Sequence, residues 1–411
     1  MQTATVRVES VAAGGDGVAR VDSLVLFLPR TAPGDELTAR FEPAKGRRFA
    51  RGEVAALIHP AADRVTAPCA HYVADRCGGC QLQHLRYDAQ VDAKARIIGD
   101  ALARLAKRPV PLPAVRPSTA EWRYRRKLTL ALRRAGRAWI AGLHPYDVPD
   151  VVFELRECPI TDPRVLEVWR EVMDAAPRLP QAPQLRGAVR LDGDGATFLL
   201  QGADTWPESL AFFEAVPSLS SLWWQPRHQK RRLMFERGGS HAPGASFVQV
   251  NAGVAAEMHR HVIERVLAHR PRVVVDAYAG LGETAVALAR EGLSVTAIEL
   301  DADAARWCAG QLPPGSRAVA ARVEDALPDA LPADVVILNP PRTGIDPRVA
   351  AVLEQSAPPP AAIIYVSCDP ATLARDLARM PRFRIQGLVG FDMFPQTAHV
   401  ETVCELVPER A

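Results

Sequence analysis

The sequence predicts a multidomain protein with a small N-terminal β-barrel, a central α+β domain and a C-terminal α/β domain of the Rossmann type. Short β-type runs broken by Gly and Pro fill the first 60 residues, and strands alternate with helices from about residue 252 onward. A length of 411 residues exceeds one hydrophobic core, because domains of about 150 residues are typical. We expect the three domains at 1–60, 61–248 and 249–411.

The first 60 residues have the pattern of a small antiparallel barrel. The β-type runs are Val6–Val11, Gly17–Val21, Leu24–Leu28 and Glu36–Phe41. Turn-forming sequences separate them, notably Gly14-Gly15-Asp16-Gly17 and Ala32-Pro33-Gly34-Asp35.

The central domain is predicted to combine loops, one long helix and a series of strands. Residues 61–84 are loop-like and carry three cysteines, whereas residues 86–107 repeat apolar side chains at the three- and four-residue spacing of a helix. Residues 115–245 favour strands and loops, interrupted by helical stretches near 163–175 and 206–214.

The C-terminal domain alternates strands with helices, which predicts a parallel sheet covered on both faces. The expected helices are 252–268, 283–291, 302–311, 346–356 and 370–379, and the expected strands are 272–276, 294–299, 334–338 and 361–366, followed by two terminal strands. A ligand of such a sheet binds at the carboxyl ends of the strands.

Composition narrows the class of protein. Hydrophobic residues make up 48% and charged residues 24%, as in soluble globular proteins, and no stretch approaches about 18 uncharged apolar residues. The N-terminus lacks the apolar core of a signal peptide. We therefore expect a cytoplasmic protein that does not associate with a membrane.

Cationic residues cluster with aromatic ones in the central domain. One cluster holds Arg123, Arg125, Arg126, Lys127, Arg133, Arg134 and Arg137 with Trp122, Tyr124 and Trp139, and a second holds Arg227, Lys230, Arg231 and Arg232. Such mixtures suit the phosphates and stacked bases of a nucleic acid. Solvated strand faces of an Arg-rich protein explain the charges equally well.

A glycine-containing turn after an apolar strand predicts a nucleotide-binding loop. The strand ends at Asp276, and Tyr278-Ala279-Gly280-Leu281-Gly282 leads from it into a helix. Glycines let the backbone approach a ligand closely, and Glu299 at the end of the next strand can hold ribose hydroxyls. The loop alone fits a nicotinamide dinucleotide as well as S-adenosylmethionine.

The sequence Asn339-Pro340-Pro341-Arg342 follows the strand predicted at 334–338. Two prolines after an Asn or Asp at a strand end make a rigid turn whose carbonyls face the site. Enzymes that methylate nucleobases commonly carry this motif, and it has no role in hydride transfer. The motif therefore favours S-adenosylmethionine, although an ordinary exit from a strand is the plainer interpretation.

Cys368 stands where an apolar strand meets the start of a helix. Asp369 is a candidate helix cap and Pro370 suits the first helical turn. A thiol beside a helix N-terminus is expected to ionise more readily, although the neighbouring Asp369 opposes that shift.

Uracil explains why a methyltransferase would use a thiol. Carbon 5 of uracil is a poor nucleophile, and addition of a thiolate to carbon 6 converts the ring into an enolate that attacks a methyl group. A base must then remove the proton from carbon 5, and Glu401 can be that base. We expect Cys308 and Cys404, inside a helix and a strand, to be packing residues.

The remaining cysteines have the spacing of a metal site. Seven residues separate Cys69 from Cys77, Gly78-Gly79 separates Cys77 from Cys80, and Cys158 stands alone. Four thiolates suit zinc or an iron–sulfur cluster, and the spacing alone favours zinc. A redox pair of Cys77 and Cys80 is a third interpretation, although no thioredoxin-like unit surrounds it.

Together these motifs resemble those of the uridine-5 RNA methyltransferases, specifically the members with an N-terminal TRAM barrel, of OB-like fold, and an iron–sulfur cluster that act on ribosomal RNA. The resemblance covers essentially the whole chain. The motifs that carry it are Cys77-Gly78-Gly79-Cys80-Gln81-Leu82-Gln83-His84, Phe247-Val248-Gln249-Val250-Asn251, Asp276-Ala277-Tyr278-Ala279-Gly280, Ser367-Cys368-Asp369-Pro370-Ala371-Thr372-Leu373-Ala374-Arg375-Asp376 and His399-Val400-Glu401-Thr402-Val403.

The resemblance implies a role for each candidate residue. Cys368 would be the nucleophile and Glu401 the base. The implied S-adenosylmethionine contacts are Gln249, Tyr278, Glu283, Glu299 and Asn339. A 4Fe–4S cluster, in place of the zinc that spacing favours, would be held by Cys69, Cys77, Cys80 and Cys158. The helix near 86–107 is expected to pack on the catalytic domain.

The resemblance also implies the partners of the protein. Ribosomal RNA is the expected substrate and transfer RNA the alternative, and we expect a monomer. The sequence departs from the family at Asn339, where Asp is usual, and at Glu283, where a small or amide residue is usual. The seven-residue gap after Cys69 is longer than in close relatives of the family.

Three other functions remain open from the sequence. The Asn-Pro-Pro motif is typical of enzymes that methylate amino groups of adenine or guanine, which need no thiol and usually place an aromatic residue where Arg342 stands. A non-catalytic RNA-binding or redox-sensing protein would also carry the barrel and the cysteines. Cytosine-5 methylation uses a thiol as well, but the neighbourhood of Cys368 resembles the uridine enzymes.

Overall fold

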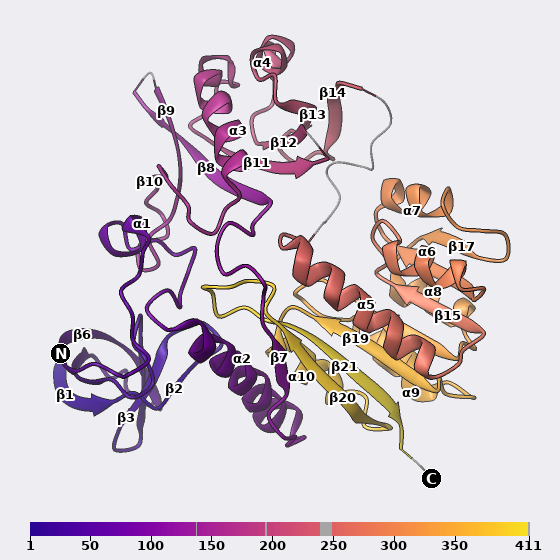
Figure 1. The fold of residues 1–411 in the computed structure, drawn as a ribbon, viewed down its shortest axis with the longest axis horizontal. Coiled ribbons are helices and arrows are strands. Elements are labelled where there is room, and N and C mark those ends of the chain that lie inside the picture. Colours follow the sequence, from indigo (N-terminus) through magenta and orange to yellow (C-terminus); the bar gives the residue numbers. More distant parts are fainter. Residues whose placement is uncertain (137, 194, 239–248, 410–411) are drawn as a thin grey trace. The chain divides into compact units, whose positions relative to one another are not determined.

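The computed structural model describes residues 1–136, 138–193, 195–238 and 249–409, which form two compact units coloured along the chain in Figure 1. Unit 1 consists of Met1–Tyr87, Ala120–Ala252 and Pro395–Ala398, and unit 2 consists of Asp88–Thr119, Gly253–Phe394 and His399–Ala411. The chain therefore passes from one unit to the other several times. None of the described helices is long and apolar enough to cross a membrane.

The N-terminal part of unit 1 is a six-stranded sheet in the order β1-β5-β6-β4-β3-β2. Its strands are β1 (Gln2–Arg7), β2 (Ser10–Val11), β3 (Gly17–Val21), β4 (Leu24–Leu28), β5 (Glu36–Phe41) and β6 (Phe49–His59). The long strand β6 pairs with both β5 and β4, and Leu26, Leu28 and Leu37 fill the core between the strands. Three of the predicted β-type runs coincide with β3, β4 and β5, whereas the run Val6–Val11 spans the end of β1 and all of β2, and β6 is an additional strand.

A short helix, α1 (Ala70–Ala74), and a seven-stranded sheet make up the rest of unit 1. The strands, in spatial order, are β10 (Phe153–Glu154), β9 (Ala138–Leu143), β8 (Lys127–Ala135), β11 (Gln184–Asp192), β12 (Gly195–Gln201), β13 (Leu219–Gln225) and β14 (Arg232–Glu236). Helices α3 (Pro163–Asp174) and α4 (Ser209–Ala215) cover one face, where Trp169 and Phe212 each lie against Phe198. A 3-10 turn, Ala176–Arg178, follows α3.

Unit 2 is built on an eight-stranded sheet in the order β17-β16-β15-β18-β19-β21-β20-β7. Its strands are β7 (Ala114–Arg116), β15 (Val273–Ala277), β16 (Ser294–Glu299), β17 (Arg317–Ala320), β18 (Val335–Leu338), β19 (Ala362–Ser367), β20 (Phe383–Phe391) and β21 (Glu401–Pro408). Adjacent residues of β15 enter different cores, since Val274 belongs to one apolar cluster and Val275 to the other. Each face of the sheet therefore carries its own core, as expected for an α/β domain.

The sheet of unit 2 is only partly parallel, which corrects the expectation of a parallel sheet. The strands from β17 to β19 run parallel, whereas β21 is antiparallel to both β19 and β20. Strand β7, which precedes the central sheet in the chain, joins the far edge beside β20. Alternating helices predict only the parallel strands, because an antiparallel hairpin needs no crossover helix.

The helices of unit 2 follow the predicted positions with one addition. They are α2 (Tyr87–Ala101), α5 (Ala252–Ala268), α6 (Glu283–Arg290), α7 (Ala302–Ala309), α8 (Val323–Ala330), α9 (Pro347–Gln355) and α10 (Pro370–Leu377). Helix α8 and the neighbouring strand β17 are absent from the sequence-based prediction. Pro328 lies inside α8, and β17 is a four-residue strand at the sheet edge, so neither has a strong local pattern.

Helix α2 continues into a π-helical turn, Leu102–Ala106, and both belong to unit 2. Ile98 and Leu102 are fully buried in the core of that unit. Lys94 is also fully buried, where its ammonium donates to the carboxylate of Asp392 and, over 3.0 Å, to the carbonyl oxygen of Phe394. The helix is thus fixed to the end of β20 by an ion pair as well as by apolar packing.

We expect Lys94→Met to lower the free energy of unfolding by about 3–5 kcal/mol, because it leaves the buried Asp392 carboxylate without its cation. Urea unfolding followed by far-ultraviolet circular dichroism measures the change in the free energy of unfolding. The matched control is Arg96→Met, an exposed cation on the same helix, which should change stability by less than about 0.5 kcal/mol. Equal effects of the two substitutions would contradict the prediction.

Candidate functional site

Four loops of unit 2 begin at the carboxyl ends of parallel strands. Tyr278 follows β15, Asn339 follows β18 and Cys368 follows β19, while Glu299 is the last residue of β16. Strand β21 runs the opposite way, so its first residues lie at this same edge. Ser367 pairs with Thr402, which sets Glu401 beside Cys368.

Cys368 is the most accessible thiol of the chain. It is half-buried, whereas the other six cysteines are buried. Burial raises the pKa of the Cys368 thiol, the Glu401 carboxylate raises it further, and the Arg342 guanidinium lowers it. The expectation of a thiol that ionises more readily is therefore wrong for the resting site, since burial and the Glu401 carboxylate raise its pKa.

The start of α10 is occupied by its own cap. Asp369 accepts a hydrogen bond of 2.9 Å from the backbone N–H of Thr372, as predicted for a helix cap. Its negative charge also adds to the upward shift in the pKa of Cys368. The Asp369 carboxylate thus offsets part of the positive potential of the helix N-terminus that would otherwise act on the Cys368 thiol.

Glu401 is a buried carboxyl group at the first position of β21. Its residue is 3% exposed, and burial raises its pKa to about 7, partly opposed by Arg342. A carboxyl group with a pKa near neutrality can hold or release a proton at physiological pH. Glu401 and Cys368 therefore form a pair of adjacent titratable groups at the carboxyl edge of the sheet.

Arg342 is a charged neighbour of the pair that the sequence did not predict among the site residues. Its charge lowers the pKa of both Cys368 and Glu401, so it lies near both groups. Arg342 ends the Asn-Pro-Pro-Arg motif, where the sequence indicated only that the aromatic residue usual in amino-group methyltransferases is replaced. The guanidinium is the cation that stabilises the anionic forms of the pair.

Helix α10 holds the loop that carries Arg342. The Thr372 hydroxyl donates to the carbonyl oxygen of Arg342 at 3.1 Å, and Arg375 donates to that of Thr343 at 2.6 Å. The fully buried Asp376 accepts from the backbone N–H of Ile345 at 2.9 Å.

Asp376 also accepts a hydrogen bond of 2.7 Å from the hydroxyl of Tyr365 in β19. Gly344 has a φ of +83°, and a Cβ there would collide with the Asp376 carboxylate. The buried carboxylate therefore connects β19, α10 and the loop, which fixes the backbone on either side of Cys368.

The loop after β15 has the shape of a nucleotide cradle. Tyr278 has a φ of +64° and Gly282 a φ of +83°, and a Cβ on Gly282 would collide with Cys308. Glu299 spans the loop, since its carboxylate accepts from the backbone N–H of Gly280 at 2.9 Å and from that of Asp301 at 2.7 Å.

Asp276 lies beneath this loop. Burial raises its pKa to about 7, and its Oδ2 has no hydrogen-bond partner among the described residues. A buried polar atom of this kind is expected to have a partner, which a bound ligand or ordered water can supply. The loop thus fits a nucleoside-containing cofactor.

The other predicted cofactor residues are more scattered. Asn339 and Glu283 are exposed, at the end of β18 and the start of α6. Gln249 belongs to unit 1, and its side-chain oxygen is buried with no hydrogen-bond partner in the described part of the chain. Phe247 and Val248 of the same motif lie outside the described residues.

Four buried thiols gather in unit 1. Burial raises the pKa of Cys77 to about 11, and the neighbouring Cys158 and Cys69 raise it further. The pKa of Cys80 is also raised, by burial and by the same three thiols. No group of three or more His, Cys, Asp or Glu side chains within the described ranges is placed to hold a metal ion. The structure therefore brings the predicted thiols together without showing a metal site.

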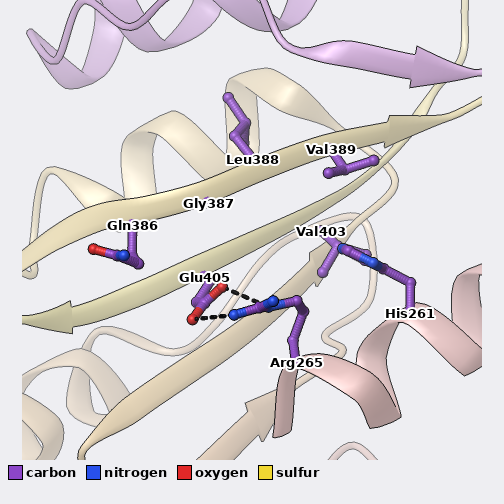
Figure 2. A pocket seen from close by; sticks show the side chains of 8 residues that line it. All are labelled: His261, Arg265, Gln386, Gly387, Leu388, Val389, Val403 and Glu405. Carbon is purple, nitrogen blue, oxygen red and sulfur yellow. Dashed lines mark hydrogen bonds and ion pairs between the residues drawn. The ribbon is translucent and has the colours of Figure 1, made fainter. Parts of the chain in front are cut away.

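Unit 2 also contains a cavity of about 230 Å³ that none of the predicted site residues lines (Figure 2). Its acidic group, Glu405, accepts from Arg265 at 2.8 Å and contacts His269 at 2.7 Å. These partners neutralise the carboxylate. The lining residues are His261, Arg265, Gln386, Gly387, Leu388, Val389, Val403 and Glu405.

Two family profiles match this chain. The profile of the tRNA (uracil-5-)-methyltransferases matches residues 315–408, which include Asn339, Cys368 and Glu401, and the profile of the TRAM domain matches residues 1–55. The second match agrees with the predicted N-terminal barrel, and the first covers β17 to β21 but not the loop after β15.

The chain is similar to RNA methyltransferases along almost its whole length. It is 30% identical to an uncharacterized RNA methyltransferase of Thermosynechococcus vestitus, with 98% of each chain covered. It is 31% identical to one of Gloeobacter violaceus, with 98% of this chain and 96% of the relative covered.

A solved structure has the same fold. The Pyrococcus abyssi tRNA (uracil-54, C5)-methyltransferase, in complex with S-adenosyl-L-homocysteine, is 23% identical, with a TM-score of 0.70 and 98% and 99% of the two chains covered. Since the match spans nearly all of both chains, the fold extends to the whole molecule. The chain therefore belongs to the RNA methyltransferases, with a domain of the tRNA (uracil-5-)-methyltransferase family at residues 315–408 and a TRAM domain at its N-terminus.

Proposed function

We propose that the protein methylates carbon 5 of a uridine in RNA, with Cys368 as the nucleophile and Glu401 as the base. The observation that carries this proposal is the pairing of β19 with β21, in which Ser367 lies opposite Thr402. That register sets an accessible thiol beside a buried carboxyl group at the carboxyl edge of a methyltransferase sheet. Thiol addition and proton removal at adjacent ring carbons need two such groups.

The two side chains act in sequence on one ring. The Cys368 sulfur, as the thiolate, forms a bond to carbon 6, and the electrons of the carbon 5–carbon 6 double bond move into an enolate. S-adenosylmethionine, when bound, supplies the electrophilic methyl group that carbon 5 takes. The Glu401 carboxylate then removes the proton from carbon 5, the double bond re-forms and the Cys368 thiolate leaves.

The charges around the pair suit both steps. Burial keeps Cys368 protonated at rest, and the Arg342 guanidinium stabilises the thiolate once it forms. The same cation prevents the pKa of Glu401 from rising further, which preserves a carboxylate fraction near neutral pH. A buried base and a half-buried nucleophile therefore share one counter-ion.

S-adenosylmethionine would be held by Tyr278, Glu283, Glu299 and Asn339, with Gln249 as a further contact. The loop after β15 supports this assignment, because its glycine lets the backbone approach a ligand and Glu299 ends the next strand. Asn339 offers an amide oxygen where a carboxylate is usual in the family. Its neutral charge is expected to weaken cofactor binding without changing the reaction.

The RNA would be bound partly by the seven-stranded sheet of unit 1. Lys127 on β8 and Arg190 on β11 occupy paired positions, where Lys127 is half-buried and Arg190 is buried. Burial lowers the pKa of Lys127, and the nearby guanidinium groups of Arg190, Arg125 and Arg186 lower it further. Cations crowded in this way gain stability from phosphates that neutralise them.

Ribosomal RNA remains our predicted substrate, with transfer RNA as the alternative. The matching family profile and the Pyrococcus abyssi enzyme are both named for transfer RNA. Because the target base must leave its stack to meet Cys368, a uridine in a loop suits the site better than one in a duplex. We also expect the protein to act as a monomer.

The four thiols of unit 1 would hold a 4Fe–4S cluster. Four thiolates can bind either a zinc ion or a 4Fe–4S cluster, and the resemblance of the motifs to the iron–sulfur members of the family favours the cluster. Four buried cysteines that still influence one another suit a larger cluster, which accepts four thiolates. Cys69, Cys77, Cys80 and Cys158 are the proposed ligands.

RNA that contains 5-fluorouridine should trap a covalent complex with the wild-type protein, because fluorine cannot leave as a proton does. We expect Cys368→Ala to abolish trapping, and Glu401→Gln to accumulate a covalent complex with ordinary uridine. Denaturing gels of ribosomal and transfer RNA transcripts measure both. Full methylation by Cys368→Ala would contradict the proposal and favour amino-group methylation.

The rate of methylation should rise with pH through about 7, because Glu401 accepts a proton only as the carboxylate. Arg342→Gln removes the cation that lowers the pKa of Glu401 and Cys368, so the profile should move to higher pH. Arg306→Gln, an exposed cation paired with Asp303, is the control and should leave the profile unchanged. A pH-independent rate between 6 and 8 would count against Glu401 as the base.

Protein purified without oxygen should contain about four iron atoms and four sulfides per chain if all four thiols are ligands. Cys80→Ser should lose most of this iron, whereas Cys308→Ser, which alters a buried thiol of unit 2, should retain it. Elemental analysis and sulfide determination measure the content. One zinc ion per chain would contradict the cluster.

A further inference from the structure

Shortly before the proposed base, Glu401, the chain leaves unit 2 for four residues, Pro395–Ala398, which belong to unit 1. Strand β20 ends at Phe391 and β21 begins at Glu401, so residues 392–400 form the tip of the hairpin that these strands make. Within this tip, Pro395–Ala398 belongs to unit 1, whereas Phe394 and His399 belong to unit 2. Only His399 and Val400 separate that segment from Glu401.

Backbone groups next to the cysteines hold this segment. The backbone N–H groups of Gln81 and Leu82 donate to the carbonyl oxygen of Gln396 at 3.1 and 3.0 Å. Gln396 is 2% exposed and has a φ of +69°, an unusual conformation for a residue with a side chain. Its backbone is kept there by the two donors, because such a conformation persists only where neighbouring contacts impose it.

Two side chains add to this attachment. The Gln81 side-chain oxygen accepts from the backbone N–H of Ala398 at 3.4 Å, and the Tyr124 hydroxyl donates to the carbonyl oxygen of Pro395 at 2.9 Å. Both ends of the four-residue segment are thereby fixed. Gly15 packs against Gln81 and Ala398, and a Cβ there would collide with Gln81.

Gln81 also belongs to the cysteine loop. It follows Cys80 directly, and its side-chain amide donates to the carbonyl oxygen of Gly78 at 2.9 Å. The NH2 group of the Gln81 amide therefore bonds within the loop Cys77–Cys80, and the amide oxygen bonds to the tip of the hairpin. The Tyr72 hydroxyl donates to the Gln81 carbonyl oxygen at 3.1 Å and further restricts the residue.

The other end of the tip is fixed in unit 2. Lys94 binds Asp392 and the carbonyl oxygen of Phe394, just before the chain enters unit 1. Glu401 pairs with Phe391 across the hairpin, just after the chain returns. Glu401 therefore lies directly after a short hairpin tip, and Gln81 and Tyr124 hydrogen-bond to the central residues of that tip.

We propose that Gln81 and Tyr124 are positioning residues for the proton-removal step, acting through the segment Pro395–Ala398 on Glu401. The cysteine loop thus helps to place the catalytic base. This inference rests on the proposed roles of Cys368 and Glu401. Addition of the thiol to carbon 6 does not involve Glu401 as a base, so loosening the tip should slow proton removal more than it slows addition.

The test uses the full-length protein and RNA that carries tritium at carbon 5 of uridine. We expect Gln81→Leu and Tyr124→Phe each to slow tritium release roughly tenfold to a hundredfold, because small displacements of a catalytic group have effects of this size. Formation of the covalent complex should stay within about twofold of wild type, so that this complex accumulates. Gln81→Glu keeps an acceptor for Ala398 and should recover part of the rate.

The matched controls are Gln386→Leu on the exposed part of β20 and Tyr146→Phe in unit 1. Both should leave tritium release unchanged. Equal slowing of both steps, or no slowing of either, would overturn the inference. Failure of the wild-type protein to be trapped by 5-fluorouridine RNA would instead overturn the proposed function, so the two failures are distinguishable.

Discussion

The antiparallel pairing of β21 with β19 is the constraint on which the candidate site depends. Because β21 runs against the parallel strands, its first residue lies at the edge where they end. The Ser367–Thr402 register then brings the Glu401 carboxyl group and the Cys368 thiol together. A slip of one residue would turn the Glu401 side chain to the opposite face of the sheet, because side chains alternate along a strand.

Burial and one cation set the chemical state of that pair. Desolvation raises the pKa of both groups, which keeps the thiol protonated at rest and brings Glu401 to about 7. Arg342 opposes both shifts from a loop that Thr372, Arg375 and Asp376 of α10 hold in place. The buried Asp376 therefore influences the reacting groups indirectly, through the loop that it orders.

Much of this protein followed from local patterns in the sequence. The β-type runs near the N-terminus, the helix near 86–107 and the alternation after residue 252 all appear in the structure, because each has a strong local period. Strand β17 and helix α8 were missed, since one is very short and the other contains Pro328. The thiolate expected at Cys368 was wrong, because a helix N-terminus can be inferred from sequence whereas desolvation cannot.

The sequence by itself determined the family, because the residues around Cys368 and Glu401 form recognisable local motifs. Only the tertiary structure decided how distant segments meet: Lys94 with Asp392, Arg342 with both members of the pair, and Gln81 with Gln396. Such contacts join residues up to 315 positions apart, and no local period records them. The hairpin of β20 and β21 carries Asp392, Gln396 and Glu401, which are far in sequence from Lys94, Gln81 and Arg342.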